Sequence, residues 1–369
     1  MEYRQLGHSG LLVSNLALGT MNFGTRETPE EEAFAQLDAF LDAGGNLIDT
    51  ADVYNGGVAE ETVGRWFAAR PREVTGRAVI ATKGRTRTGD DVNDAGTSRR
   101  HLDRALTTSL RRLGTDAIDL YQLHAWDPLT PVEETLSFLD AAVRAGKIRY
   151  VGLSNHTGWQ LQLAVSTARA NGYQVPVSLQ AQYNLATRQT EWEMIPAARH
   201  NGLGVLAWSP LASGFLTGKY DRDQPRPAGT RAGQDHALYQ YTSSNYEDSD
   251  QTWASVDAVR QVAKETGSSP AQVALSWVIG RPGVVSAIVG ARNAAQLSGN
   301  LAAADVNLDP DAMAALDAAS DPHPAPYPYG PFGSAQRDRT ANDPEALGQL
   351  IRTHANATKE APDAVHPAR

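Results

Sequence analysis

Four polar side chains that could act together in proton transfer stand at or just beyond the ends of short apolar segments. Asp49, Lys83 and His124 each end such a segment, and Tyr54 follows Asp49 by five positions. A phenol has a reference pKa of about 10, so it needs help to act as an acid near neutral pH. Lowering that pKa by ~3 units requires ~4 kcal/mol, which one ammonium at ~4 Å supplies at an effective dielectric of ~20. Lys83 would meet this need for Tyr54, provided that Asp49 keeps it charged.

The fourth side chain, His124, could donate a hydrogen bond to a carbonyl oxygen and orient it. The set then forms a proton donor aimed at a carbonyl group, and it lacks a source of electrons, so it implies a hydride-carrying cofactor. Each residue also fits a structural role: Asp49 as a turn cap, Lys83 reaching solvent from a strand end, and His124 and Tyr54 as packed side chains. Their convergence on one face of the molecule would favour the catalytic interpretation.

The elements that would bring them together are strands that alternate with helices along the chain. Most of the apolar segments are rich in β-branched residues and nearly continuous, which is typical of strands buried on both faces. Eight strand–helix units predict an α/β fold of the (β/α)8 TIM-barrel type, whose strands end at one mouth. A doubly wound sheet is the alternative, and no Gly-rich dinucleotide turn follows any strand to support it. The expected strands are 15–19, 47–49, 78–83, 117–124, 148–154, 177–182, 204–209 and 286–290.

Two helices have the same predicted start. Thr28 and Thr130 are each followed by Pro and have Glu three residues later, which predicts a Thr N-cap with Pro at the first helical position. Residues 209–250 have no helix or strand pattern and predict a long loop after the seventh strand, of the kind that is often a functional lid.

The composition changes after Ser320. Five Pro residues in 321–333 predict an extended arm, residues 344–355 predict a short surface helix, and the final residues read as a disordered tail. We therefore expect a barrel over 1–320, followed by a Pro-rich arm and partly disordered tail over 321–369.

Composition and charge exclude several classes of function. The 369 residues contain no Cys and no HExxH spacing, so no disulfide, thiolate site or zinc site is expected. A net charge of −9 argues against nucleic acid or an anionic membrane as a partner. Residues 1–10 contain no apolar segment typical of a secretion signal, and no apolar run is long enough to span a bilayer. We expect a cytoplasmic protein that acts on a small molecule, and its oligomeric state is open.

Several segments resemble the aldo-keto reductase family. They occur in the family's order over roughly 2–320. The segment at 208–220 is similar to the branch of bacterial reductases and potassium-channel β subunits. These segments are LALGTMNFG (16–24), LIDTADVYNGGVAEETVG (47–64), ATKG (81–84), IDLYQLH (118–124), IRYVGLSN (148–155), QAQYN (180–184), WSPLASGFLTGKY (208–220) and IVGARNAAQLSGN (288–300).

The resemblance implies a barrel that reduces aldehydes and ketones with NADPH, or less often NADH. Asp49, Tyr54, Lys83 and His124 would form the catalytic tetrad, with Tyr54 as the general acid. The family also implies an alternative, an NADPH-binding regulatory subunit that senses redox state with little turnover. A Schiff-base lyase with Lys83 as the nucleophile is a further alternative, and it requires a neutral Lys83, which Asp49 opposes.

The resemblance also implies a set of residues that contact the cofactor. Ser154, Asn155 and Gln180 would hold the nicotinamide carboxamide, and Trp208 would stack on its ring. Arg292 would pair a 2′-phosphate, a planar task suited to Arg that favours NADPH, although it also fits a surface Arg at a helix start. The remaining members are Gly19, Thr20, Met21 and Asp49 near the first two strand ends, Ser209, Leu211, Ser213, Gly214 and Lys219 near the pyrophosphate, and Gly290, Gln296 and Asn300 near the adenosine.

The sequence constrains the substrate least. Phe23 and Trp126 would face the mouth beside Tyr54 and His124 and form an apolar wall, or they would pack against loops. Residues 84–98 bring Arg85 and Arg87 towards the rim, where they would meet an acidic substrate or remain solvated loop charges. Sugar-derived, short and aromatic aldehydes all stay open as substrates.

Overall fold

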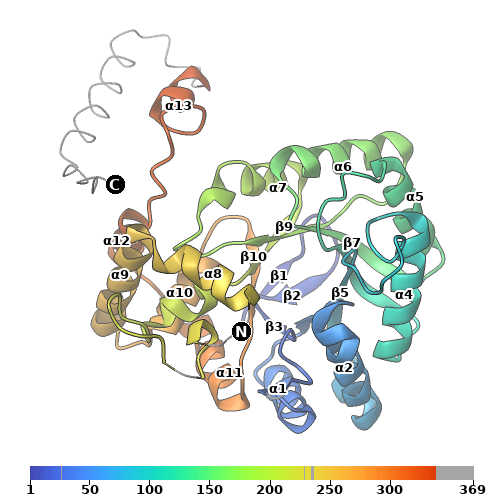
Figure 1. The fold of residues 1–369 in the computed structure, drawn as a ribbon, viewed down its shortest axis with the longest axis horizontal. Coiled ribbons are helices and arrows are strands. Elements are labelled where there is room, and N and C mark those ends of the chain that lie inside the picture. The colour runs from blue at the N-terminus through green and yellow to red at the C-terminus, as the bar shows by residue number, and fades with distance from the viewer. Residues whose placement is uncertain (26, 228, 234–236, 338–369) are drawn as a thin grey trace. The chain divides into compact units, whose positions relative to one another are not determined.

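Eight parallel strands close into a barrel in the computed structural model, which describes residues 1–25, 27–227, 229–233 and 237–337 (Figure 1). The strand order is β10-β3-β4-β5-β6-β7-β8-β9, so each strand pairs with its neighbour in the chain and the last pairs with the first. The predicted (β/α)8 barrel is confirmed, and the strand ends differ from prediction by a few residues. The strands are β3 (Leu16–Gly19), β4 (Leu47–Asp49), β5 (Val79–Gly84), β6 (Ile118–Leu123), β7 (Ile148–Ser154), β8 (Ser178–Gln182), β9 (Gly204–Trp208) and β10 (Val284–Val289).

Helices surround the barrel, and the main hydrophobic core lies between them and the outer faces of the strands (Figure 1). This core explains the 3.6-residue spacing of apolar residues in the helices, because one stripe of each helix faces the sheet. The helices are α1 (Glu30–Asp42), α2 (Val58–Ala69), α3 (Arg72–Thr75), α4 (Arg99–Leu113), α5 (Val132–Arg144), α6 (Gly158–Asn171), α7 (Met194–Asn201), α9 (Asp250–Thr266), α10 (Pro270–Ile279), α11 (Ala294–Leu301) and α12 (Pro310–Ala319).

A β-hairpin precedes the barrel, and sequence reasoning did not anticipate it. Its strands, β1 (Tyr3–Gln5) and β2 (Leu12–Ser14), pair antiparallel and lead directly into β3. Leu6 and Val13 are fully buried in a second, smaller core cluster with residues from the barrel strands. Because the hairpin enters β3 at its beginning, it lies at the N-terminal end of the strands, opposite the end where barrels carry their chemistry.

The two predicted Thr caps are wrong. Helices α1 and α5 begin one residue later than expected, with Pro29 and Pro131 in the cap positions and no side-chain cap hydrogen bond. The Thr28 hydroxyl instead donates to the Arg292 carbonyl at 3.4 Å, and the Thr130 hydroxyl donates to Asp127 at 2.7 Å. A distant carbonyl group and a nearby loop carboxylate have therefore taken the hydroxyl groups that the pattern assigned to the helix ends.

The long segment after β9 is more ordered than its sequence predicts. It contains two 3₁₀ helices, η3 (Ala212–Thr217) and η4 (Arg231–Gly233), and the helix α8 (Ala237–Glu247). Tyr246 of α8 is buried, its ring lies 5.6 Å from that of Phe215, and its hydroxyl accepts a hydrogen bond from Gln182 at 2.6 Å. These contacts supply the burial that fixes a helix whose own pattern is weak.

The chain divides into two compact units, Met1–Ser320 and Asp321–Arg369. The described part of the second unit contains a short helix, α13 (Pro331–Arg337), so the expected extended arm ends before residue 333. The predicted helix over 344–355 and the predicted tail lie outside the described residues. No helix among the described residues is long and apolar enough to cross a membrane.

Candidate active site

Three of the four predicted catalytic groups meet at the C-terminal ends of β4 and β5. Lys83 is fully buried, and its Nζ lies 2.5 Å from Oδ1 of Asp49 and 2.9 Å from the Thr50 carbonyl oxygen. The same Nζ donates to the Tyr54 hydroxyl at 3.3 Å. Tyr54 opens the short 3₁₀ helix η1 (Tyr54–Gly57), so the five-residue offset carries the phenol beyond the strand while Asp49 stays at its end.

The fourth group, His124, follows β6 directly and completes the cluster. Its ring stands edge-on to the Tyr54 ring, with 5.9 Å between centroids and an interplanar angle of 77°. Its Nδ1 lies 3.3 Å from the Thr86 hydroxyl. The strand ends therefore bring together all four side chains that the sequence singled out.

Burial dominates the electrostatics of the cluster. It raises the pKa of Tyr54 above its ordinary value, and the nearby Lys83 ammonium only partly opposes it. Lys83 lowers this pKa as expected, but the expected net lowering is wrong for this structure, because desolvation of the phenolate outweighs one favourable charge. Tyr54 holds its proton firmly at neutral pH, the state in which it can donate.

The two neighbouring basic groups differ in charge. Burial acts to lower the pKa of Lys83, but Asp49 and Tyr54 more than compensate, and the net pKa is raised, so Lys83 stays an ammonium. Burial, with the charges of Lys83 and Arg85, lowers the pKa of His124 to about 3. The imidazole is therefore neutral at physiological pH, which suits a hydrogen-bonding group better than a proton reservoir.

Two glutamine amides complete the hydrogen bonding of Asp49. Gln180 donates to Oδ2 of Asp49 at 2.7 Å, and Gln122 donates to the same oxygen at 3.3 Å. Gln180 was predicted to face the cofactor, and in this structure its amide nitrogen faces Asp49. Gln122 was not predicted, although its place two residues before His124 on one strand puts both side chains on the same face.

A second ion pair, also missed from the sequence, holds the turn that carries Tyr54. Arg112 of α4 donates to the carbonyl oxygens of Asp52 at 2.9 Å and Gly56 at 3.2 Å, and to the fully buried Glu60 at 3.2 Å. A Cβ on Gly57, whose φ is +101°, would stand 2.1 Å from Cζ of Arg112, so only glycine fits there. Nothing in the spacing of these residues along the chain signals the contact.

Replacing Arg112 by Met is expected to destabilise the fold by about 3 kcal/mol, because it leaves Glu60 buried without its charge partner. Urea unfolding at pH 7 measures the change, and Arg111→Met, which alters the exposed neighbouring residue, is the matched control. A stability equal to that of the control would show that the pair does not hold the turn.

The residues predicted around the nicotinamide cluster beside the tetrad. Asn155 has a left-handed backbone with φ of +51°, and it donates to the His124 carbonyl at 2.9 Å. Its amide oxygen accepts from the Trp208 indole at 3.1 Å, which fixes the plane of that ring. The Ser154 hydroxyl is buried with no hydrogen-bond partner among the described residues.

The residues predicted for the pyrophosphate share one tight turn after β9. Ser209, Ser213 and Gly214 have φ of +53°, +54° and +93°. A Cβ on Gly214 would approach Nζ of Lys219 to 2.8 Å, and this ammonium lies 5.0 Å from the centre of the Tyr220 ring. Turned backbone of this kind, next to a cation, forms concavities that bind anions. Leu211, the residue before η3, is half-buried against the core.

The residues predicted for the adenosine end lie before α11 and along it, with Gln296 in its first turn and Asn300 in its last. The Gln296 side chain accepts from the Arg292 amide at 2.9 Å, and the Arg292 guanidinium donates to the Gly229 carbonyl at 2.5 Å. The Asn300 amide nitrogen is buried without a partner among the described residues, and Gly290 has open space where a side chain would lie.

Near the first strand, the residues predicted to contact the cofactor make contacts within the protein itself. The Thr20 hydroxyl is buried and donates to the Asp49 carbonyl at 3.1 Å, and the Met21 carbonyl accepts from Asn55 at 2.9 Å. A Cβ on Gly19 would meet Ile288 at 2.9 Å. Phe23 is 1% exposed and packs in the core, so the expectation that it lines the mouth is wrong, because the chain turns it inward.

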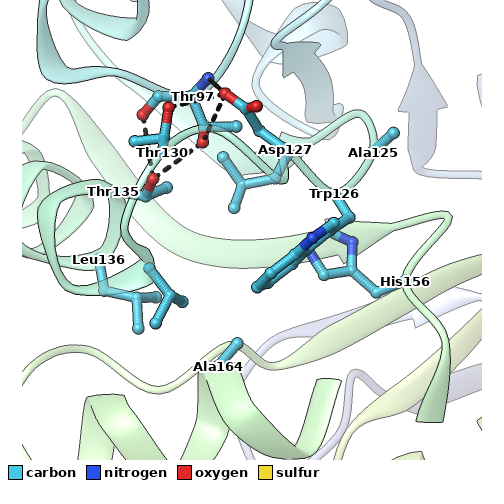
Figure 2. A pocket seen from close by; sticks show the side chains of 11 residues that line it. Thr97, Ala125, Trp126, Asp127, Thr130, Thr135, Leu136, His156 and Ala164 are labelled. Carbon is cyan, nitrogen blue, oxygen red and sulfur yellow. Dashed lines mark hydrogen bonds between the residues drawn. The ribbon is translucent and has the colours of Figure 1, made fainter. Parts of the chain in front are cut away.

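Trp126 is placed among aromatic residues on the helix side of the barrel. Its ring lies 5.7 Å from that of His156 and 5.5 Å from that of Trp159. Figure 2 shows the ring beside His156 in a small pocket, which Thr97, Asp127 and Thr130 also line. This arrangement fits loop packing, the structural alternative for Trp126.

The two rim arginines are held by the loop itself. Arg85 donates to the Trp126 carbonyl at 3.3 Å, and Arg87 donates to the Gly89 and Asp91 carbonyls, each at 3.0 Å. Among the described residues, neither guanidinium forms a hydrogen bond with a side chain of the tetrad. These contacts fit the interpretation of Arg85 and Arg87 as charges of the loop rather than as groups that bind a substrate.

Comparison with known proteins identifies the family. The sequence profile of the Aldo/keto reductase family matches residues 15–321. The chain belongs to the aldo/keto reductase family. It is an oxidoreductase, and enzymes of this family bind a nicotinamide cofactor and act on small molecules, with carbonyl reduction as their general chemistry.

Individual relatives confirm the predicted branch of the aldo/keto reductases. An uncharacterized oxidoreductase of Bacillus subtilis is 39% identical, with 86% of this chain and 95% of that protein covered. A probable voltage-gated potassium channel β subunit of rice is 38% identical, with 83% and 92% covered. A versiconal hemiacetal acetate reductase of Aspergillus parasiticus is 34% identical, with 86% and 96% covered.

The residues present fit a nicotinamide cofactor on structural grounds. Ser154 and Asn300 each have a buried polar atom without a partner, and they lie in the two groups predicted to contact opposite ends of the cofactor. Buried polar atoms without partners are costly, so a ligand that bonds to them would relieve that cost. No group of three or more metal-ligating side chains occurs among the described residues.

Proposed function

We propose that this protein uses NADPH to reduce an aldehyde or ketone to the alcohol, with Tyr54 as the general acid. The observation that carries the proposal is the buried chain of contacts in which Asp49 holds the Lys83 ammonium at 2.5 Å and Lys83 holds the Tyr54 hydroxyl at 3.3 Å. A phenol beside a fixed cation, at the mouth of a barrel, suits proton transfer coupled to hydride transfer from a bound cofactor.

The chain's own residues act on the carbonyl oxygen. A neutral His124 whose Nδ1 accepts from Thr86 carries its proton on Nε2, which can donate to that oxygen and orient it. Tyr54 then gives its proton to the same oxygen, and the Lys83 ammonium stabilises the phenolate that remains. Asp49, with its two glutamine amides, keeps Lys83 charged. NADPH, when bound, supplies the hydride that the carbonyl carbon receives.

The cofactor would lie across the strand ends between the tetrad and α11. Ser154, Asn155 and Gln180 would hold the carboxamide, and the fixed Trp208 ring would stack on the nicotinamide. Ser209, Leu211, Ser213, Gly214 and Lys219 would hold the pyrophosphate in their turn, and Gly290, Arg292, Gln296 and Asn300 would hold the adenosine end.

A preference for NADPH over NADH rests on Arg292. Among the described residues, its guanidinium donates to the carbonyl of Gly229 in a loop, a contact that a 2′-phosphate can displace. Replacing Arg292 by Met is expected to lower kcat/KM for NADPH by roughly 10- to 100-fold, the value of a charge-assisted hydrogen bond, and to leave kcat/KM for NADH nearly unchanged. Initial rates with both cofactors measure this, and Arg292→Lys should recover part of the loss. Equal losses with the two cofactors would contradict the assignment.

A panel of sugar-derived, short and aromatic aldehydes, followed by NADPH absorbance, tests the proposal and narrows the substrate. The rice relative, named as a probable channel β subunit, favours one alternative: a subunit that binds NADPH and senses redox state with little turnover. Tight NADPH binding with no oxidation by any member of the panel would support that alternative.

A Schiff-base lyase is not supported. A nucleophilic Lys83 would have to be neutral, and Asp49 and Tyr54 raise its pKa. We further propose a cytoplasmic protein with no nucleic acid or membrane as partner, in keeping with the net charge of −9.

A further inference from the structure

Asp52 is a buried carboxyl group in the turn between Asp49 and Tyr54 that the proposed mechanism does not use. Its side chain is 2% exposed, and neither carboxyl oxygen has a hydrogen-bond partner among the described residues. Its backbone is fixed on both sides, because its amide donates to the Lys83 carbonyl at 3.1 Å and its carbonyl accepts from Arg112 at 2.9 Å. The backbone therefore fixes the carboxyl group in place from both sides.

Charged and titratable groups face Asp52 from every element around it. Burial, followed by the charge of Glu60, raises the pKa of Asp52 to about 8, and Arg112 and Lys83 oppose the rise. The group is therefore mostly neutral at neutral pH and ionised in mild alkali. The facing groups are Glu60 from α2, Arg112 from α4, Lys83 from β5, Tyr54 from η1 and Tyr121 from β6.

Asp52 also lines a polar cavity. The cavity has a volume of ≈ 180 Å³, enough for several water molecules, and Nε2 of His101 is buried there without a partner. The other polar side chains that line the cavity are Thr88, Arg104, Thr108 and Arg112.

We propose that Asp52 is a positioning residue whose charge controls how readily Tyr54 gives up its proton. With Asp52 neutral, the charges acting on the phenolate are those of Lys83 and Asp49, whereas an ionised Asp52 adds a further negative charge that opposes the phenolate. Its charge acts on Tyr54 in the direction that makes the phenol the weaker acid. The inference rests on Tyr54 as the proposed general acid and adds a reversible control of it.

The pH profile of reduction tests the control. The wild type should lose roughly three- to tenfold in kcat as pH rises through 8, because a weaker acid slows proton transfer. Asp52→Asn, which is neutral at every pH, should lack this step, and Asp90→Asn, which removes an exposed charge from the loop before α4, should keep it. Asp52→Ser serves if the Asn variant folds poorly. A step of the same size in the Asp52 variants would overturn the proposal.

A titration without turnover separates this inference from the proposed function. Difference absorbance of each protein against the same protein carrying Tyr54→Phe isolates the Tyr54 phenolate. Asp52→Asn should lower the midpoint by about one pH unit relative to the wild type, the shift that one nearby charge produces. A lowered midpoint in a protein that reduces no aldehyde would support Asp52 and contradict the reductase. Equal midpoints would overturn the role of Asp52 whatever the activity.

Discussion

Replacing Tyr54 by Phe is expected to lower kcat for carbonyl reduction by roughly 10²- to 10⁴-fold, the usual contribution of a general acid. The phenyl ring keeps the edge contact with His124, whose ring centroid lies 5.9 Å away, so the site keeps its shape and loses only the proton. NADPH affinity, measured by fluorescence titration, should change by no more than about twofold, because the hydroxyl acts in the transition state and not in cofactor binding.

Tyr173→Phe is the matched control, because Tyr173 packs against the core beyond the end of α6, away from the tetrad. This variant should keep full activity. If Tyr54→Phe retained wild-type kcat across the substrate panel, Tyr54 would not be the acid, and the proposed mechanism would fall.

Replacing Lys83 by Met should harm both activity and stability. The ammonium contributes ~4 kcal/mol to the phenolate at this range, so kcat should fall by roughly 10³-fold. The fold should lose about 3–5 kcal/mol, because Asp49 is only 3% exposed and would remain as an uncompensated buried charge. Stopped-flow turnover and urea unfolding at pH 7 measure the two losses.

The double variant Asp49→Asn with Lys83→Met separates the two effects. Removing the stranded carboxylate should restore most of the stability and none of the activity, because the double variant still lacks the cation beside Tyr54. A double variant as unstable as Lys83→Met would show that the loss comes from packing and not from the buried charge.

The barrel could be predicted because its signal is repeated and local. Eight apolar segments with helices between them allow few arrangements, and parallel strands must end at one face. The hairpin from Tyr3 to Ser14 and the helix α8 escaped prediction because tertiary burial, not local pattern, holds them. The Thr28 and Thr130 caps failed because other acceptors took their hydroxyl groups, a distant carbonyl for Thr28 and a nearby loop carboxylate for Thr130.

The residues of the candidate site could be predicted where a polar or charged side chain stands at the end of an apolar strand. Asp49, Lys83 and His124 carry that signal, and the structure adds the distances that join them to Tyr54. The direction of the Tyr54 pKa was not predictable, because the sequence does not show how deeply the phenol is buried.

Residues outside that pattern were missed. Arg112 acts from a helix 58 positions after Tyr54, where neither spacing nor residue type marks it as a partner of the turn. Gln122 and Asp52 carry polar groups next to predicted site residues, which is the one signal that could have found them. Trp126 and Phe23 were predicted at the mouth but pack elsewhere, because an aromatic residue near a strand end can turn towards helices as easily as towards the mouth.

The central claim, hydride transfer from NADPH coupled to protonation of a carbonyl, is tested most directly by following the hydrogen itself. The protein is incubated with NADPH deuterated at the transferring position and an aldehyde from the panel, and the product is examined by mass spectrometry. The account predicts an alcohol with one deuterium on the former carbonyl carbon, formed in step with NADPH consumption. Tight NADPH binding without product, or an alcohol without deuterium, would contradict it.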